Sequence, residues 1–383
     1  MSKYPPCTAT KTLNLCPLDS QLFLLHAQLM WNTFKTDTAL TEHQLELTLS
    51  LYNQIKGLPM HISLVEKAKS LIETQDNRAL FLIFNQGFKE FGPLYPLVLF
   101  YALHPAIISL YNSLDITESV RQATLSDIAI WVKTYEDQHR GTTGLDRYGW
   151  ICRHLCAKIV RLGRLQFEQS LFRFPYSIYY DKQLLQYRTF AQEGLVCDAD
   201  GFIGISDGSK FSSWTTVFSV TGDILVAHEV DQSLGNISRL AKSVPLSDLT
   251  LICTQDTPVL SVHIPEGEAL TPSLVDASFS LAQAMFKPTL FVCDSWLLDP
   301  ELSNVLPMES NICHFMQRFL KFPVAFTTAQ IYERVFGFGA TQSDILTWEC
   351  TTSLQKKVQS HIRSGGIFRT MGGYIPTPSL LKV

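Results

Sequence analysis

One stretch, residues 259–298, constrains the fold of this chain more than any other. Residues 259–265 are mostly apolar, and a short Gly-containing segment follows them. A helical pattern then runs from Thr271-Pro272 to Phe286, and a second apolar run covers 289–298. Thr271 suits a helix N-cap, and Pro272 suits the first helical position. Strand, helix and strand in this order predict a right-handed β-α-β unit with parallel strands.

Ligands of such units bind at the carboxyl ends of the strands, against the helix N-terminus. Polar or reactive side chains are concentrated at the corresponding positions of this chain. The side chains expected there come from both strands: His263, Glu266, Cys293, Asp294, Ser295 and Trp296. Functional residues are therefore expected among them.

The rest of the chain predicts two domains. Residues 1–145 repeat apolar side chains at helical spacing in segments bounded by Gly or Pro, which is typical of an all-α domain. A helix over 146–162 is expected to link it to a second domain, 146–383. After Gly163 the pattern becomes alternating, as in half-buried strands. A mixed β-sheet with helices on its faces is the simplest packing of those elements, so the predicted class is α/β with an α+β mixed sheet.

Composition narrows the possible partners and the compartment. The net charge of −4 argues against a nucleic-acid-binding surface, which needs a basic footprint. Nine cysteines without regular spacing are typical of reduced thiols, and the N-terminal residues lack an apolar signal-peptide core. We therefore expect a cytoplasmic protein that does not bind nucleic acid.

The stretch 93–111 is apolar enough to be weighed as a membrane span. Pro96 and Pro105 interrupt it, and His104 lies beside the second proline. A buried helix that breaks at His104-Pro105 fits these residues better than a span, so no membrane association is expected.

Several motifs resemble a bacterial family of acyltransferase-domain proteins. They are Leu-Ser-Val-His-Ile-Pro-x-Gly-x-x-Leu-Thr-Pro at 260–272, Ser-Trp-Leu-Leu-Asp-Pro-x-Leu at 295–302, Ser-Asn-Ile at 310–312, Gly-Leu-Asp-x-Tyr-Gly-Trp at 144–150 and Arg-Leu-Gly-Arg-Leu-Gln-Phe-Glu at 161–168. Members of that family carry a helical N-terminal domain before a GNAT-like C-terminal domain. The resemblance implies a GNAT-like fold and acetyl-CoA or another acyl-CoA as cosubstrate. It also implies direct attack of an amine on the thioester, without a covalent acyl-enzyme.

Coenzyme A would need a cradle for its pyrophosphate, and the start of the helix after 259–265 is the available segment. Its predicted cofactor-binding residues are Gly267, Leu270, Thr271 and Ser273. The usual GNAT signature, Gln/Arg-x-x-Gly-x-Gly/Ala, is missing here. Glu266 and Glu268 stand in the loop instead, and their charges would repel a diphosphate. The loop could thus contact a cationic substrate group through Glu266, or form a solvated turn.

Glu168 is the first candidate for the catalytic base, and His263 is a second candidate for proton transfer. Glu168 shares a strand face with Gln166, a predicted substrate-binding residue, while the residues between them face the other way. The alternative for Glu168 is an exposed strand face or an ion pair with Arg164 or Arg173. His263 has the pKa range of a proton shuttle. A structural histidine bonded to the backbone is its alternative.

Ser295 is the third predicted catalytic residue, as a hydrogen-bond donor to the thioester carbonyl. A nucleophilic serine would want a Gly-x-Ser-x-Gly elbow, which is absent. Trp296 is predicted to line the substrate cavity, with a place in the core as its alternative. A Cys293–His263 pair would instead suggest cysteine catalysis.

No metal site is predicted. Cys152 and Cys156 share a helix face, but His154 points elsewhere and no second ligand pair is near in sequence. Two functions remain open: an acyltransferase acting on a small amine, and a non-catalytic ligand-binding or regulatory protein on the same fold. The acidic loop favours the second, and the polar strand ends favour the first.

Overall fold

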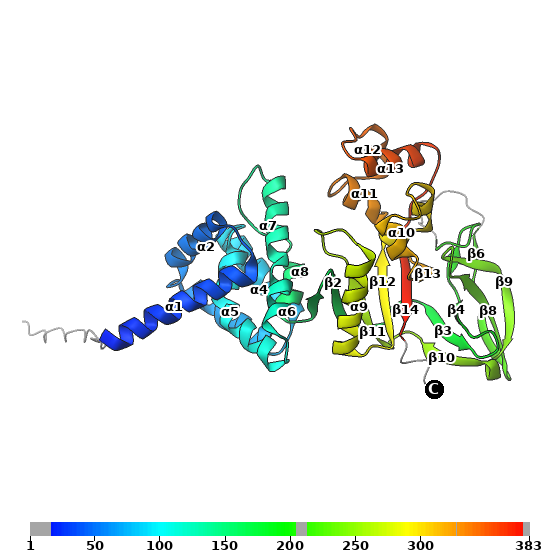
Figure 1. The fold of residues 1–383 in the computed structure, drawn as a ribbon, viewed down its shortest axis with the longest axis horizontal. Coiled ribbons are helices and arrows are strands. Elements are labelled where there is room, and N and C mark those ends of the chain that lie inside the picture. The colour runs from blue at the N-terminus through cyan, green and yellow to red at the C-terminus, as the bar shows by residue number, and fades with distance from the viewer. Residues whose placement is uncertain (1–16, 204–212, 327, 378–383) are drawn as a thin grey trace, which may run out of the picture. The chain divides into compact units, whose positions relative to one another are not determined.

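A computed structural model of the chain describes residues 17–203, 213–326 and 328–377, with side chains from Gln28 onward. It divides into two compact units, Met1–Lys158 and Ile159–Val383 (Figure 1). This division falls after helix α8 (Tyr148–Leu155), which the sequence analysis assigned to the second domain.

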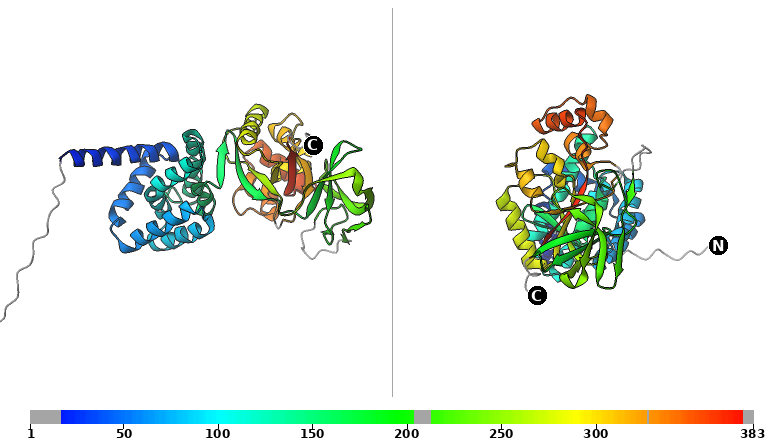
Figure 2. Two further views of the ribbon diagram at one scale, coloured as in Figure 1. Left: turned by 90° about the horizontal axis from the view of Figure 1, so that it is seen from below. Right: turned by 90° about the vertical axis from the view of Figure 1, so that its right-hand side faces the viewer.

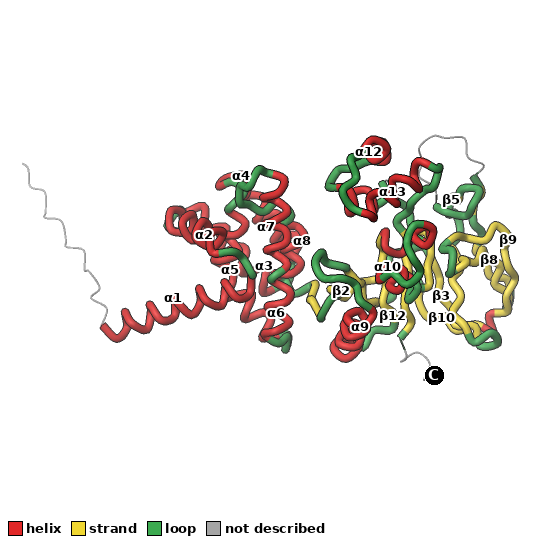
Figure 3. Tube along the Cα trace, turned by 45° about the horizontal axis from the view of Figure 1, so that its top comes forward, coloured by secondary structure: helices red, strands yellow, loops and turns green. Residues whose placement is uncertain are grey.

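The first unit is helical throughout its described part, as Figure 3 shows. Side chains of Thr41, Asp76 and Thr117 cap three of its helices by accepting from an amide three residues on. The predicted all-α character is confirmed. Besides α8, the helices are α1 Pro17–Thr38, α2 Glu42–Ile55, α3 Pro59–Glu73, α4 Asn77–Phe91, α5 Tyr95–Ser113, α6 Glu118–Leu125 and α7 Asp127–Gln138.

Helix α5 contains most of the apolar stretch 93–111. It continues through Pro105, so the predicted break at His104-Pro105 is wrong. His104 is buried, and its Nε2 lies 2.7 Å from Oδ2 of Asp37, which also accepts from Arg121. This pairing explains how a histidine is accommodated in an apolar helix. Among the helices that the structure describes, none is both long and apolar enough to cross a membrane.

The second unit opens with a β-hairpin where the sequence pattern predicted the end of a linker helix. β1 (Ile159–Leu162) pairs antiparallel with β2 (Leu165–Leu171) across a turn at Gly163, whose φ is +67°. The β-branched side chains of Ile159 and Val160 favour a strand, and tertiary pairing outweighs the helical spacing read from the sequence.

The first sheet has the strand order β1-β2-β11-β12-β14-β13. β11 and β12 are parallel, and the other neighbours are antiparallel. Phe279 of α9 contacts Phe167 and Phe291, so this helix covers one face of the sheet (Figure 1). The predicted β-α-β unit is present. The bounds are β11 Pro258–His263, α9 Pro272–Phe286, β12 Leu290–Ser295, β13 Leu320–Pro323 and β14 Met371–Pro376.

A second sheet is inserted in sequence between β2 and β11. Its order is β10-β3-β4-β8-β7, and β9 pairs with β8. Tyr176 and Ile178 of this sheet share a core with Val292, Phe322 and Tyr374 of the first, so it covers the face opposite α9. Figure 2 shows its green strands grouped beside the red strand β14. The bounds are β3 Tyr176–Asp181, β4 Gln186–Ala191, β7 Phe218–Thr221, β8 Ile224–Asp231, β9 Asn236–Pro245 and β10 Leu249–Cys253, with a separate pair β5 Val196–Cys197 and β6 Trp214–Thr215.

Short helices complete the unit, and those that follow β12 share an apolar cluster of their own. The side chain of Asp299 caps η3 by accepting from the amide of Glu301. The predicted mixed sheet with flanking helices is confirmed. The bounds are η1 Leu246–Asp248, η2 Trp296–Leu298, η3 Pro300–Asn304, α10 Asn311–Met316, α11 Gln330–Phe336, α12 Gln342–Thr347 and α13 Ser353–Arg363.

Candidate functional site

The two parallel strands of the first sheet separate at their carboxyl ends. Their pairing comprises Leu260 with Phe291 and Ser261 with Val292, yet β11 continues to His263 and β12 to Ser295. The last residues of both strands therefore diverge directly in front of the loop that leads into α9. An opening of this kind lets a ligand approach the backbone between two neighbouring strands.

Side-chain alternation decides what each face presents at this opening. On β12, Phe291 and its i+2 neighbour face α9, while Val292 and Asp294 face the second sheet. On β11, Ser261 pairs with Glu168 and His263 with Gln166, so these four side chains share the face opposite α9. Glu168, His263 and Asp294 therefore gather on one face at the diverging ends.

The predicted proton-transfer residues contact one another. Nε2 of His263 lies 3.2 Å from Oε2 of Glu168, and their side chains are 26% and 14% exposed. A partly buried carboxylate beside an imidazole holds the ring orientation and stabilises the imidazolium form. The pair thus has the geometry of a histidine base oriented by a carboxylate.

Asp294 faces the same opening from β12. Its Oδ1 accepts from Nη2 of Arg173 at 2.8 Å. Burial raises the pKa of Asp294, while the positive charges of Arg173 and His263 act in the opposite direction. The carboxylate of Asp294 therefore lies close enough to both Arg173 and His263 for their charges to affect its pKa.

Gln166 is the neighbour of His263 across the strand pair. Its side chain is 1% exposed, and Nε2 is buried without a hydrogen-bond partner in the described part of the chain. A buried amide N–H left unpaired costs about 1–3 kcal/mol, so such a group is a candidate donor to a ligand. The sequence analysis predicted Gln166 to bind substrate, and the structure places it next to His263.

An arginine organises the loop between β11 and α9. Arg164 is 5% exposed, and it donates from Nε to the Glu268 carbonyl at 2.6 Å and from Nη1 to the Pro265 carbonyl at 2.8 Å. Its own amide donates to Oγ of Ser278 in α9. Arg164 therefore ties the β1–β2 turn, the loop and α9 together. The sequence analysis considered Arg164 only as a partner for Glu168.

The N-terminus of α9 lies at the end of this loop. Thr271 is its N-cap residue, but its side chain makes no capping hydrogen bond. The amides of Ser273 and Leu274 precede the first i−4 bond of the helix, from Val275 to the Thr271 carbonyl. These amides and the helix dipole are available to an anion. Gly267, with φ +126°, has no atom within 4 Å of an added Cβ, Leu270 is buried, and Ser273 is exposed.

A second arginine stands beside the first turn of α9. Arg318 pairs with Asp276 and approaches the Pro272 carbonyl, while its Nε is buried and unpartnered among the described residues. Sequence reasoning missed Arg318 because it lies far along the chain, in the segment before β13. Burial of one guanidinium N–H without an acceptor is the structural signal that identifies it.

The structure does not bring Ser295 or Trp296 to the Glu168–His263 pair. Ser295 lies on the α9-facing side of β12, and its Oγ accepts from the amide of Leu297 to cap η2. Trp296 belongs to η2 and packs against the apolar cluster of the short helices. The sequence does not show which face of β12 meets the opening.

Cys293 is also separated from His263. It lies on the α9-facing side of β12, and burial raises the pKa of its thiol well above the usual value. A cysteine–histidine pair is therefore not formed. In the residues that the structure describes, no group of three or more His, Cys, Asp or Glu side chains has the geometry of a metal site.

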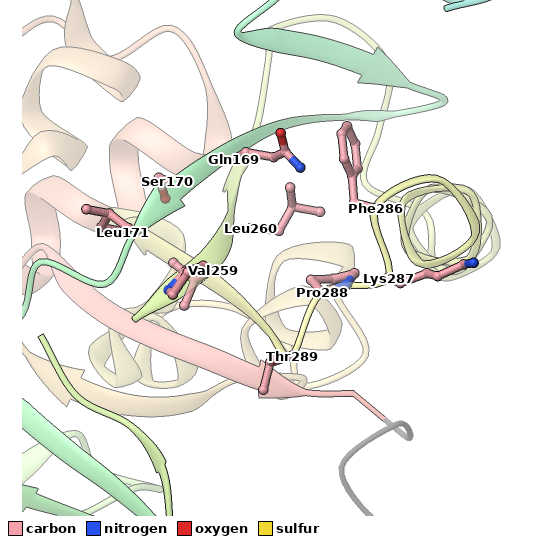
Figure 4. A pocket seen from close by; sticks show the side chains of 10 residues that line it. Gln169, Ser170, Leu171, Val259, Leu260, Phe286, Lys287, Pro288 and Thr289 are labelled. Atoms are coloured by element: carbon pink, nitrogen blue, oxygen red, sulfur yellow. The ribbon is translucent and has the colours of Figure 1, made fainter. Parts of the chain in front are cut away.

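Two cavities of similar size lie in the second unit. One, of about 450 Å³, is at the amino ends of β11 and β12 and is shown in Figure 4. There Gln169 and Ser170 of β2 and Leu260 of β11 lie near Phe286 and Lys287 at the end of α9. The other, of about 460 Å³, includes Asp294 in its lining. Only the second reaches the strand ends that carry the polar cluster.

Comparison with known proteins supports the same architecture. Residues 159–375 match the GNAT-like C-terminal domain, and residues 32–157 match the N-acyltransferase N-terminal domain. Among curated proteins, no relative matches the sequence.

Two solved structures are similar in fold. An acyltransferase mutant in complex with octanoyl-CoA is 17% identical with a TM-score of 0.55, over 92% of this chain and 88% of that one. An acyltransferase in complex with CoA and 10C-teicoplanin is 18% identical with a TM-score of 0.47, over 76% and 69% of the two chains. The family match to 159–375 covers more than half of the chain. The protein therefore belongs to the family in which an N-acyltransferase N-terminal domain precedes a GNAT-like C-terminal domain.

Proposed function

We propose that this protein transfers an acyl group from an acyl-CoA thioester to a small amine by direct attack. One observation carries the proposal. The carboxyl ends of β11 and β12 diverge in front of the uncapped N-terminus of α9, and the Glu168–His263 pair lies at the same strand ends on the sheet face opposite α9. An anion-binding helix end and a proton acceptor then lie at one strand edge, as acyl transfer from CoA requires.

The pyrophosphate of CoA is placed on the loop and first turn, Gly267–Ser273. Arg164 shapes the loop through two carbonyls, and Arg318 offers its unpartnered Nε beside the first turn of α9. These arginines offset the exposed Glu266 and Glu268 that make the loop acidic. The solved acyltransferase of similar fold described above is in complex with octanoyl-CoA, which supports an acyl-CoA such as acetyl-CoA as cosubstrate.

His263 is assigned as the base, whereas the sequence favoured Glu168 for that role. The contact of its Nε2 with Glu168 orients the ring. The amine nitrogen forms the new C–N bond, the C–S bond breaks, and the CoA thiolate leaves. An ammonium acceptor first releases one proton to solvent to become the neutral amine. His263 takes the second proton, which the amine loses as it attacks, and Glu168 stabilises the resulting imidazolium. Base catalysis of this kind contributes about 10²–10⁴-fold to the rate.

The alternative is a protein that binds a ligand without turnover, which the acidic loop favoured. The arrangement of Arg164 and Arg318 weakens that argument, because cationic groups flank the same loop. The contact between Glu168 and His263 has no evident use in simple binding. We therefore favour the acyltransferase.

The test combines binding with turnover. Calorimetric titration with CoA and acetyl-CoA should give saturable binding, and release of free thiol from acetyl-CoA should depend on an added amine such as phenethylamine. Glu168→Gln should reduce amine-dependent release while leaving CoA binding unchanged. Glu193→Gln, which alters an exposed carboxylate after β4, is the matched control. Failure of both CoA and acetyl-CoA to bind would refute the proposal.

A further inference from the structure

The cavity that includes Asp294 has the character of a binding pocket for an organic molecule. Its volume of about 460 Å³ lies in the range of small-molecule sites, about 300–1,000 Å³. Most of its wall is apolar. The apolar residues are Phe174, Pro175, Leu195, Ile203, Val324, Ala325 and Phe326. Such a wall suits the hydrocarbon body of a ligand.

The cavity also contains one ion pair. Of the described residues that line it, Asp294 is the one carboxylate and Arg173 the one cation. Asp294 is rooted in β12 and 35% exposed, whereas the Arg173 side chain is 68% exposed. Exposed ion pairs contribute about 0–1 kcal/mol, so the guanidinium can be displaced from the carboxylate with little loss. Arg173 can then rest over the ring of Phe174, where its guanidinium carbon already lies 5.2 Å from the centroid.

Asp294 connects this cavity to the reactive pair. The last β11–β12 pairing, Ser261 with Val292, places His263 and Asp294 next along the two strands and on the same face. A group held by Asp294 would therefore be presented across the opening to His263. Asp294 thus lies between the cavity and His263.

We propose that this cavity holds the acceptor, and that the acceptor is a primary amine on an aryl or medium alkyl body. The ammonium group replaces the Arg173 guanidinium on Asp294, and the apolar body fills the cavity. This inference rests on the proposed acyl transfer for its biological role, but the binding site itself stands on the cavity and the ion pair. It names Asp294 as the residue that selects a cationic acceptor.

The acyl chain of the cosubstrate is a less suitable occupant. A hydrocarbon tail would desolvate Asp294 and Arg173 without offering either a hydrogen bond, which is unfavourable for charged groups. An ammonium group instead replaces one cation with another and keeps the carboxylate paired. The charge in the lining therefore favours the amine.

The test uses phenethylamine and its uncharged analogue 2-phenylethanol, titrated by calorimetry into the full-length protein. Asp294→Asn should weaken phenethylamine binding at least tenfold and leave 2-phenylethanol unchanged. Arg173→Met should strengthen phenethylamine binding, because the competing cation is gone. Asp223→Asn, at an exposed turn between β7 and β8, is the control and should change neither. Opposite effects at 294 and 173 distinguish recognition from a merely structural ion pair, which would give loss in both variants.

A fourth variant separates the two possible occupants. Ala325→Phe fills the cavity from an exposed position, so phenethylamine binding should fall while CoA and octanoyl-CoA still bind. Loss of octanoyl-CoA binding with CoA retained would make the cavity an acyl-chain pocket and overturn the inference, as would equal phenethylamine affinity in Asp294→Asn and the native protein. If phenethylamine binds as expected but neither CoA nor acetyl-CoA does, the amine site holds and the proposed acyl transfer fails.

Discussion

Replacing Arg164 by methionine should test whether the loop before α9 must be held in shape for CoA to bind. The guanidinium is buried and donates to the carbonyls of Pro265 and Glu268. Methionine keeps much of the apolar volume and removes both hydrogen bonds. The Ser278 contact is made by the backbone amide at 164, so it remains in the variant.

The effect on stability is expected to be small. Each bond from a charged donor contributes about 1.5–3 kcal/mol, so about 3–6 kcal/mol is lost. Removing the buried guanidinium also removes its desolvation penalty, several kcal/mol, which largely cancels that loss. Burial already lowers the pKa of Arg164, in line with such a penalty.

The effect on binding is expected to be large. A loop without its two anchors must be ordered when CoA binds. At about 1–2 kcal/mol per residue, ordering two residues costs about 2–4 kcal/mol. That corresponds to an affinity about 30- to 700-fold lower.

The affinity for CoA is measured by calorimetric titration, and the stability by thermal unfolding. Both are measured on the native protein and on the variants. Arg164→Lys keeps the charge, but a single ammonium group does not reproduce the planar fork that spans two carbonyls. It should therefore also weaken CoA binding. Native affinity in Arg164→Met would refute the role of loop ordering, and native affinity in Arg164→Lys alone would show that charge, not geometry, matters.

Three further predictions concern the site and the inserted sheet. Glu168→Gln should lower kcat by about 10²–10⁴-fold with little change in melting temperature, measured by thiol release; an unchanged kcat would remove Glu168 from the mechanism. The double variant Glu266→Gln with Glu268→Gln should bind CoA more tightly by calorimetry, because two charges near the diphosphate are removed; weaker binding would contradict the placement. Burial would raise the pKa of Glu229, but hydrogen bonds from Arg188 outweigh it and lower the pKa below its usual 4.5. Ionised Glu229 therefore stabilises the fold above about pH 4.5. In chemical denaturation, the free energy of unfolding should decrease as the pH falls through the folded-state pKa of Glu229. In Glu229→Gln this decrease should be smaller.

The β-α-β unit was predictable because its signals are local. The helix runs from Pro272 to Phe286, as the proline and the apolar spacing predicted, and the strands differ from prediction by a few residues at their ends. The closeness of Glu168 and His263 could not be predicted from local signals, because their strands are distant in sequence. Only the resemblance to the acyltransferase family placed them in one site. Their contact depends on β11 returning beside β2, after the chain has formed a whole inserted sheet.

What the sequence did not predict depends on tertiary pairing. Asp294 lies on the face of β12 that meets the opening, and Ser295 lies on the other face. Alternation in the sequence predicts that the two residues face opposite ways, but not which of them faces the opening. Arg164 looked like an ion-pair partner, whereas its acceptors are two backbone carbonyls in a loop whose path is invisible in the sequence. The β1 strand was predicted as helix because its apolar spacing fits both structures.

Strand β14 has a consequence for the order in which the molecule assembles during synthesis. It lies between β12 and β13 and pairs with both, so β12 lacks one of its two neighbouring strands, and β13 lacks its neighbour in this sheet, until the ribosome has passed Pro376. The helices of the first unit and the local hairpins β3–β4 and β7–β8 need no such delay. Contacts between segments distant in sequence form slowly. We therefore expect nascent chains stalled before β14 to expose the edge of β12, and to be the species that chaperones protect.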